Sequence, residues 1–186
     1  MRPRRRRWPF AVAIVVAALA AAFAVPQSRG AILDLFDFGG VTIERVDALP
    51  AAQERPLAAD LGPVVSAADA RDVLGRRPFV PDVPITLHLS GQVVSMLFIY
   101  AGEPVLLSEF RGGFSGILEK IVPPATNIET VPHGVWLQGA HLYLFPDAPP
   151  RLAGNVLLWQ RGGLTIRLEG SRLSRNEALT LSLRIR

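Results

Sequence analysis

The sequence of 186 residues contains no cysteine. This absence excludes a disulfide framework, a thiolate metal site, a cysteine nucleophile and a lipid-modified amino-terminal cysteine. The sequence also lacks a basic excess outside its first seven positions. Five of its 20 basic residues are arginines of that short stretch, and the remaining 15 face 16 acidic residues. We therefore expect no nucleic-acid partner, because nucleic-acid binding requires a basic surface.

A long apolar run follows these arginines. The sixteen residues Phe10–Val25 carry no polar side chain, and Pro26 ends the run. As a helix this run extends about 24 Å, close to the roughly 30 Å of a bilayer's hydrocarbon core. We expect residues 1–26 to be a signal anchor that keeps the arginines in the cytoplasm and places the rest of the chain outside. A cleaved signal peptide is the alternative, because the alanines at 20, 22 and 24 suit a signal peptidase, and the protein is then secreted.

Residues 27–63 are the expected membrane-proximal part. The apolar positions of Ala31–Phe38 predict a short amphipathic helix, ended by the glycine pair that follows. Val41–Val46 alternates apolar and polar residues and predicts a strand. The Ala- and Pro-rich stretch up to residue 63 has no period, which is typical of a linker.

Residues 64–186 are the expected extracytoplasmic domain. Ser66 and Asp69 have the spacing of a capping box, and Gly75 ends the helix that they begin. Ser174 and Glu177 form a second capping box near the carboxyl terminus. The expected helices are Ser66–Leu74, Ser115–Val122 and Ser174–Leu183. The expected strands are Ile85–Leu89, Gln92–Tyr100, Val105–Phe110, Asn127–Val131, Gly134–Gln138, His141–Phe145, Asn155–Gln160 and Leu164–Glu169.

The connections between these strands are short and rich in turn residues, which predicts an antiparallel meander. Leu164–Glu169 alternates apolar and polar residues, which predicts a sheet with one covered face and one solvent-facing polar face. The last helix offers Ala178, Leu179, Leu181 and Leu183 as cover for the apolar face. We therefore expect an α+β fold in which two or three helices cover a curved antiparallel sheet.

Histidines are the first candidates for a metal site. The sequence has His88, His133 and His141, and their spacing matches no zinc motif. A histidine at the start of a strand in an apolar block, as His141 is, is typical of a structural residue. We expect neither a metal ion nor another cofactor.

Serine and carboxylate side chains are the other catalytic candidates. Ser115 lies in a Gly-rich segment but lacks the glycine that a nucleophile elbow requires two positions later, so a helix N-cap is the better interpretation. Glu103 and Glu109 on one hairpin could supply an acid and a base only if a cleft held them together. We expect no catalytic residue and no enzyme, and an envelope hydrolase is the alternative.

Aromatic side chains are more prominent than clusters of polar residues, and they are the candidate contacts for a ligand or partner. Most belong in the core, but a partly covered curved sheet leaves some of them lining an apolar groove. Trp136 lies between turn-forming glycines and is the side chain that we most expect to be exposed. The candidate contacts for a ligand or partner are Trp136, Tyr143, Phe110, Arg111 and Phe114.

Several blocks resemble a known family. The blocks Phe110–Gly113, Gly134–His141 and Gly163–Gly170, with the stretch Pro26–Pro50, resemble actinobacterial anti-sigma-factor-like membrane proteins and their extracytoplasmic domain of uncharacterised function. The resemblance implies a sensory or accessory domain outside the cell, with a curved sheet like that of periplasmic lipoprotein carriers. Such regulators also carry a cytoplasmic part with His and Cys zinc ligands. Only seven residues precede Trp8, so we expect no direct sigma-factor binding.

These observations predict a non-catalytic, membrane-anchored extracytoplasmic domain that binds an envelope protein or an apolar ligand. A periplasmic-type carrier of a lipid or lipoprotein is the alternative. An open groove of several hundred Å3 on the aromatic face favours ligand binding, whereas a closed face favours protein interaction.

Overall fold

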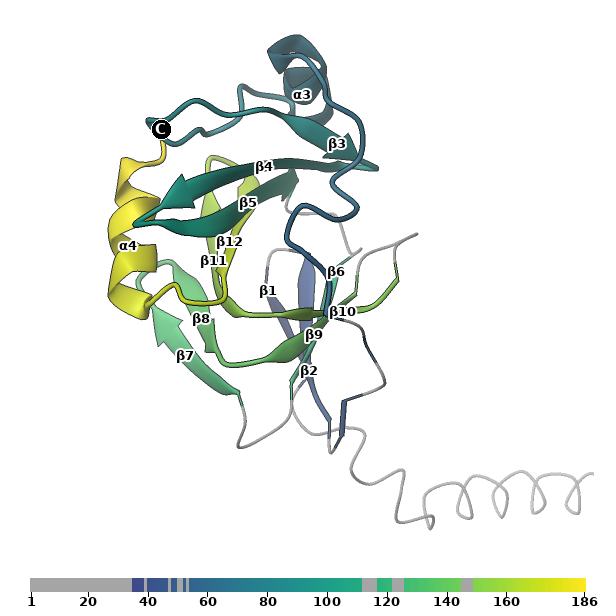
Figure 1. Ribbon diagram of the computed structural model, residues 1–186, viewed down its shortest axis with the longest axis vertical. Coiled ribbons are helices and arrows are strands. Elements are labelled where there is room, and N and C mark those ends of the chain that lie inside the picture. The colour runs from purple at the N-terminus through teal and green to yellow at the C-terminus, as the bar shows by residue number, and fades with distance from the viewer. Residues whose placement is uncertain are drawn as a thin grey trace, which may run out of the picture.

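The computed structural model describes residues 35–38, 40–46, 48–49, 52, 54–111, 117–121, 126–144 and 149–186. This part of the chain forms an α+β fold of twelve mostly antiparallel strands and two helices (Figure 1). The helices are α3 (Ala67–Leu74) and α4 (Arg175–Arg184). The strands are β1 (Leu35–Phe38), β2 (Val41–Arg45), β3 (His88–Ser90), β4 (Val93–Tyr100), β5 (Glu103–Arg111), β6 (Ile117–Ile121), β7 (Asn127–Val131), β8 (Gly134–Gln138), β9 (His141–Leu144), β10 (Arg151–Ala153), β11 (Asn155–Arg161) and β12 (Leu164–Gly170).

The strands form two sheets. The seven-stranded sheet has the order β3-β4-β5-β12-β11-β8-β7, and every neighbouring pair in it is antiparallel. The five-stranded sheet has the order β1-β2-β6-β9-β10, and its one parallel pair joins β2 to β6. Hairpins between consecutive strands are present, but β5 pairs with β12 and β8 with β11. The prediction of a simple meander is therefore wrong, because both sheets contain neighbouring strands that are not consecutive in the chain.

One long hairpin belongs to both sheets. The first arm consists of β8 and then β9, and the second arm consists of β10 and then β11. β8 and β11 pair in the seven-stranded sheet, whereas β9 and β10 pair in the five-stranded sheet. The bend falls at Gly139, which has a φ of 108°, and at Gly154. A Cβ on Gly154 would lie 2.7 Å from the Cα of Ser171, so no larger residue fits there without a shift of the backbone. Asn155 holds the corner by accepting a hydrogen bond from the backbone N–H of Gly139 (2.8 Å) and donating one to the carbonyl of Leu173 (2.8 Å).

Two hydrophobic cores lie between the helices, the seven-stranded sheet and the five-stranded sheet. The larger core lies between the helices and the seven-stranded sheet, and it joins Leu74 of α3 and Leu181 of α4 to the apolar side chains of β4, β5, β11 and β12. The smaller core lies between the sheets and contains Val41 and Ile43 of β2 with Phe110 and Leu158 of the larger sheet. The seven-stranded sheet is therefore buried on both faces, in a helix–sheet–sheet arrangement.

The two helices form where the capping boxes predict them. Ser66 Oγ accepts a hydrogen bond from the Asp69 N–H (3.2 Å), and the Asp69 carboxylate accepts one from the Ser66 N–H (3.1 Å). Ser174 and Glu177 repeat this exchange at α4. Gly75 ends α3 with a φ of 73°, a left-handed conformation that glycine adopts at little cost.

Two expected helices are strands instead. The described part of Ala31–Phe38 is β1, which forms an antiparallel hairpin with β2 across a turn at Gly40 (φ 92°). The described part of Ser115–Val122 is β6, which lies between β2 and β9. Segments of this length are too short to be stable as isolated helices, and pairing with neighbouring strands satisfies their backbone groups. Residues 1–26, Phe114 and Ser115 lie outside the described residues.

The strand predictions hold for β2, β4, β5, β7, β8, β9, β11 and β12 within one or two residues at each end. Ile85–Leu89 is only partly a strand, because β3 begins at His88. The alternation in β12 is real, but its polar residues do not face solvent. Thr165, Arg167 and Glu169 are all 0% exposed, because the five-stranded sheet covers the face that the sequence predicts to be open.

Candidate functional site

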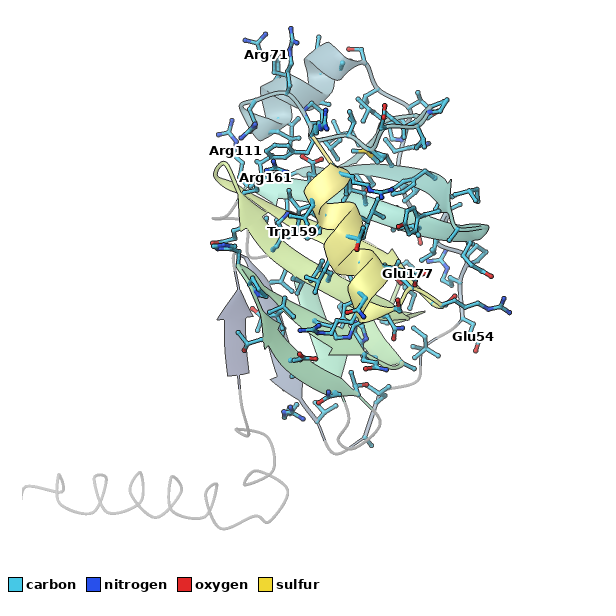
Figure 2. The ribbon with its side chains drawn as sticks, turned by 90° about the vertical axis from the view of Figure 1, so that its left-hand side faces the viewer. Glu54, Arg71, Arg111, Trp159, Arg161 and Glu177 are labelled. Atoms are coloured by element: carbon cyan, nitrogen blue, oxygen red, sulfur yellow. The ribbon has the colours of Figure 1, made fainter. Side chains whose placement is uncertain are left out.

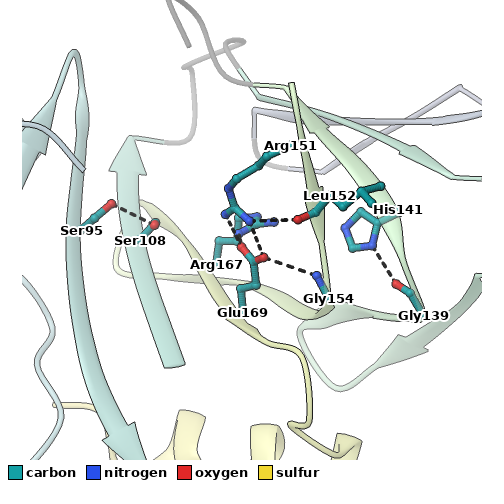
Figure 3. A network of polar contacts seen from close by, with 9 residues as sticks. All are labelled: Ser95, Ser108, Gly139, His141, Arg151, Leu152, Gly154, Arg167 and Glu169. Carbon is teal, nitrogen blue, oxygen red and sulfur yellow. Dashed lines mark hydrogen bonds and ion pairs between the residues drawn. The ribbon is translucent and has the colours of Figure 1, made fainter. Parts of the chain in front are cut away.

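A cluster of charged side chains is buried between the two sheets. Arg151 of β10 makes two hydrogen bonds to the Glu169 carboxylate of β12, at 2.6 Å from Nη1 and 2.5 Å from Nη2 (Figure 3). Arg167, two residues before Glu169, donates to the same carboxylate at 2.5 Å. The cluster links the edge strand β10 of the smaller sheet to the middle of the larger sheet.

Tyr143 packs against both arginines of this cluster. Its ring centroid lies 4.7 Å from Cζ of Arg151, its cross-strand partner, and 4.2 Å from Cζ of Arg167. Burial alone raises the pKa of Glu169, but the charges and hydrogen bonds of Arg167 and Arg151 outweigh it and lower the pKa to about 2. Glu169 is therefore ionised at neutral pH and remains within an ion-paired network.

The cavity beside this cluster is small. Its volume is about 40 Å3, and its lining includes Ser95, Ser108, Tyr143 and Arg151. Ser95 and Ser108 are opposite each other on β4 and β5, and their hydroxyls form a hydrogen bond of 2.9 Å. This space suits about one water molecule, whereas ligand pockets have volumes of roughly 300–1,000 Å3. The cluster therefore acts as a cross-link between the sheets.

Glu109 is a second buried acid, on the face of β5 that points toward the helices. It is 0% exposed, and its Oε2 accepts a hydrogen bond from the backbone N–H of Phe79 at 3.1 Å. Burial raises the pKa of Glu109 to about 8, although the hydrogen bond from Phe79 and the charge of Arg76 both oppose the rise. At neutral pH most of this carboxyl group is therefore protonated and carries no charge.

Two hollows large enough for a ligand lie on the two flanks of α4. On one flank, a groove of about 410 Å3 has Leu157 and Trp159 of β11 as its floor. Leu179 and Leu183 of α4 form one wall, and the β7–β8 turn forms the other. We call this hollow the Trp159 groove. Its lining residues are Pro132, His133, Leu157, Trp159, Gln160, Arg161, Leu179, Ser182 and Leu183.

Leu183 distinguishes the Trp159 groove. This residue is 81% exposed, the highest value among the exposed large hydrophobic residues of the described chain. Leu179 lies one helical turn earlier, so the two leucines form a stripe along the groove. The prediction that α4 buries Leu183 is wrong, because Ala178, Leu181 and Ile185 make the contact with the sheet.

The other flank of α4 carries a hollow of about 550 Å3. Its apolar part includes Val83, Phe98 and Ile99, and Ile99 is 62% exposed. Asp82, Arg184 and Arg186 also line it. This hollow is therefore more highly charged than the Trp159 groove and suits an apolar segment less well.

The structure separates the five predicted contact residues. Trp136 is 1% exposed, so the expectation of an exposed tryptophan is wrong: it pairs with Leu157 and faces the core beneath the helices. Phe110 is buried between the sheets, Tyr143 is half-buried beside the charged cluster, and Arg111 is exposed at the end of β5. Phe114 lies outside the described residues.

The sequence only partly indicates which residues form the Trp159 groove. Trp159 was one of many aromatic residues on strands, and nothing local marks it as the floor of a groove. Leu179 and Leu183 did carry a signal, since they are four residues apart and form a stripe beside the one formed by Ala178, Leu181 and Ile185. Two adjacent apolar stripes on a short helix indicate a second contact surface.

The catalytic candidates lie in different surroundings. His88 Nδ1 contacts the carbonyl of Gly62 (3.0 Å), and His141 Nδ1 contacts that of Gly139 (3.0 Å). His133 is exposed in the β7–β8 turn. Glu103 forms an exposed ion pair with Arg172 at 2.7 Å. Across the residues that the structure describes, no three His, Asp or Glu side chains are grouped so that they could hold a metal ion.

None of the described helices has the length and apolar character needed to cross a membrane. Comparison of the chain with protein-family models, with curated proteins and with solved structures finds no match. The geometry of the Trp159 groove and its surroundings therefore carries the functional interpretation.

Proposed function

We propose that this chain is a non-catalytic accessory domain that works outside the cytoplasm and binds an apolar segment of a partner protein in the Trp159 groove. The observation that carries the proposal is the exposed Leu183, which lines a groove with the half-buried Leu179 and with Trp159, a core residue that is 7% exposed. Exposed apolar side chains around a concave surface are typical of interaction sites.

The shape of the hollows favours a protein segment over an enclosed lipid. The cavity described between the sheets has a volume of only about 40 Å3, whereas the Trp159 groove is open along α4 and measures about 410 Å3. An open groove with a tryptophan floor can hold two or three anchoring side chains of a peptide. A lipid or lipoprotein carrier is the second candidate, and acyl chains that copurify with the protein favour it.

The proposed location rests on the amino terminus. Five arginines precede the apolar run Phe10–Val25, a pattern typical of a segment that inserts with its basic end in the cytoplasm. The resemblance to the extracytoplasmic domain of anti-sigma-factor-like membrane proteins supports the same location and a sensory or accessory role. We propose a membrane-anchored protein whose domain lies outside the cytoplasm.

A binding experiment with an uncharged apolar peptide tests the proposed function. The probe is an acetylated, amidated peptide of three leucines followed by three glutamines, titrated into the protein while tryptophan fluorescence is recorded. We expect Leu183→Ser to weaken binding at least about tenfold, because it removes an apolar wall of the groove. Val64→Ser is the matched control, since Val64 is 66% exposed and does not line the groove. Equal binding by the two variants contradicts the proposal.

A further inference from the structure

Two arginines line a shallow depression next to the Trp159 groove, and a third lies between the two hollows. Arg76 and Arg111 line it, together with the turn at Gly162 and Gly163, and its volume is about 600 Å3. Arg161 immediately precedes that turn and lines the Trp159 groove. Figure 2 shows Trp159, Arg161 and Arg111 in succession on the side of the molecule that faces the viewer. We call this hollow the arginine depression.

Contacts with the fold position these guanidinium groups. Arg76 donates to the carbonyl of Gly162 (3.3 Å), and its Cζ lies 4.0 Å from the ring centroid of Phe79. Arg161 donates to the carbonyl of Ile185 (2.7 Å), and its Cζ lies 4.9 Å from the same ring. Two arginines thus pack against one aromatic ring, which restricts their motion before any ligand binds.

Arg111 is positioned by the end of α3. A Cβ on Gly75 would lie only 2.5 Å from Nη2 of Arg111, so the guanidinium group rests on the glycine that ends this helix. The carboxyl end of a helix carries partial negative charge, which favours a cation there. The side chain is nevertheless exposed and lines the depression.

Within the described ranges, these three arginines form no ion pair with a carboxylate. Other arginines of the same part of the chain do so. Asp72 is exposed on α3, next to Arg71. Glu109 accepts a hydrogen bond from the backbone N–H of Phe79, but burial raises its pKa to about 8, so it is mostly protonated at neutral pH and contributes little negative charge. The depression therefore retains a local excess of positive charge in a domain that is nearly neutral overall.

The arginine depression continues the Trp159 groove. Arg161 ends the groove, and the next two residues, Gly162 and Gly163, line the depression. A peptide that places apolar side chains on Trp159 and Leu183 therefore reaches Arg76 and Arg111 after it passes Arg161. Guanidinium groups bind carboxylates through paired, charge-assisted hydrogen bonds.

We propose that the partner segment bound in the Trp159 groove continues into an acidic stretch, whose carboxylates bind Arg161, Arg76 and Arg111. This inference rests on the proposed function, because it assigns the chemistry of the partner at the same surface. It names the partner as an apolar segment followed by aspartates or glutamates. An inorganic phosphate or a phosphate-bearing polymer is the competing ligand that the experiment separates.

The experiment compares three synthetic peptides that share three leucines and end in three glutamines, three glutamates or three lysines. We expect the glutamate peptide to bind at least about tenfold more tightly than the glutamine peptide in 20 mM salt, because each charge-assisted hydrogen bond contributes roughly that factor. We expect the lysine peptide to bind more weakly than either. The advantage of the glutamate peptide falls several-fold in 500 mM salt, because added salt screens exposed charges.

Variants assign the effect to the arginine depression. Arg111→Gln should remove most of the advantage of the glutamate peptide and leave binding of the glutamine peptide unchanged, whereas Arg111→Lys should retain part of it. Arg172→Gln is the matched control, since Arg172 is an exposed arginine whose ion pair with Glu103 lies elsewhere. Circular dichroism spectra of the variants establish that each one is folded.

The outcomes separate the two proposals. Equal binding of the glutamate and glutamine peptides, or an Arg111→Gln variant that keeps the full difference, overturns the acidic-partner inference and leaves the apolar groove standing. If inorganic phosphate displaces the glutamate peptide and binds more tightly than it does, the depression is a phosphate site and the inference is overturned. A different observation would show that the proposed function is wrong: the Leu183→Ser variant would bind the glutamine peptide as tightly as the natural protein does.

Discussion

Glu169 is the residue on which the contact between the two sheets depends most. It accepts hydrogen bonds from Arg151 and Arg167 in the interior, and all three residues are at most 5% exposed. A buried ion pair gains little over a well-packed apolar alternative, but removal of one partner leaves uncompensated charge in a dry environment. The cluster therefore makes the structure sensitive to substitution at Glu169.

We predict that Glu169→Gln lowers the free energy of unfolding by about 3–5 kcal/mol, because two buried guanidinium groups lose their shared carboxylate. Urea unfolding followed by tryptophan fluorescence measures the loss. Glu103→Gln is the control, since it removes the carboxylate of an exposed ion pair, worth at most about 1 kcal/mol. Similar losses in the two variants contradict the assignment.

The same cluster predicts an acid response. The pKa of Glu169 is about 2 in the folded protein against an ordinary value of 4.5, so its stabilisation is complete above pH 4.5 and is lost as the pH falls toward 2. The loss amounts to about 3 kcal/mol over this interval. The Glu169→Gln variant should lack this part of the acid sensitivity when both proteins are unfolded by urea between pH 5 and pH 2.

Glu109 should have the opposite effect on stability. Its pKa is about 8 when folded and about 4.5 when unfolded, so the folded protein holds the extra proton between these values. Stability therefore falls as pH rises through this interval, by up to about 1.4 kcal/mol per pH unit. We predict that Glu109→Gln flattens the dependence between pH 5 and pH 8 in urea unfolding. Parallel curves for the variant and the natural protein contradict this prediction.

At the scale of elements, α4 matters because it covers the larger core and also forms a wall of the Trp159 groove. The helix has only ten residues, which is marginal for an isolated helix. Its stability therefore depends on its packing against the sheet and on the capping box at Ser174.

We predict that Ser174→Ala destabilises the protein by about 1 kcal/mol, since the side chain satisfies a backbone N–H of the first helical turn. Thermal unfolding followed by circular dichroism detects the change. The Ser66→Ala variant removes the same hydrogen bond from α3 and should show a loss of similar size. No loss in either variant means that packing alone holds these helices in place.

The elements that could be predicted from the sequence carry local signals. The capping boxes at Ser66 and Ser174 locate both helices, and turn residues locate β7 and β8 to the residue. The strands β1, β6 and β10 were not predicted, because they are only three to five residues long and, for β6, because the partner strand β2 is distant in the sequence. Local periodicity cannot separate a short strand from a short helix when the partner strand is unknown.

The candidate site was harder to predict than the fold. The sequence showed that Arg167 and Glu169 alternate with apolar residues, but not that a second sheet covers them. Trp136 and Trp159 both belong to the core beneath the helices, yet only Trp159, which is 7% exposed, also lines the groove. The exposure of each tryptophan depends on where α4 ends and on which strands lie beneath this helix, and neither can be read from the local sequence.

For the whole molecule, we predict that the amino-terminal segment determines location. A fusion of the full chain to alkaline phosphatase, which is active only where disulfides form, should be active. Replacing the five amino-terminal arginines by asparagines should lower that activity, because the basic end no longer favours the cytoplasmic side. Replacing Arg172 by asparagine is the control and should leave activity unchanged.

Fractionation completes this test. Full-length protein in the membrane fraction supports the anchor, and a shorter chain in the medium with an amino terminus near Pro26 supports a cleaved signal. An inactive fusion retained in the cytoplasm contradicts both forms of the prediction. The outcome does not affect the groove experiments, which measure peptide binding to the purified protein.

The pairing of β2 with β6 and of β5 with β12 joins segments far apart along the chain. The five-stranded sheet is complete only when β10 is available and the seven-stranded sheet only when β12 is available, and folds dominated by such long-range pairings take milliseconds to seconds to form. A protein translocated as an extended polypeptide benefits from that delay, because premature compaction blocks passage through a narrow channel. Under the location that we propose for this domain, we expect the long-range pairing of the two sheets to keep the nascent chain unfolded until it has crossed the membrane.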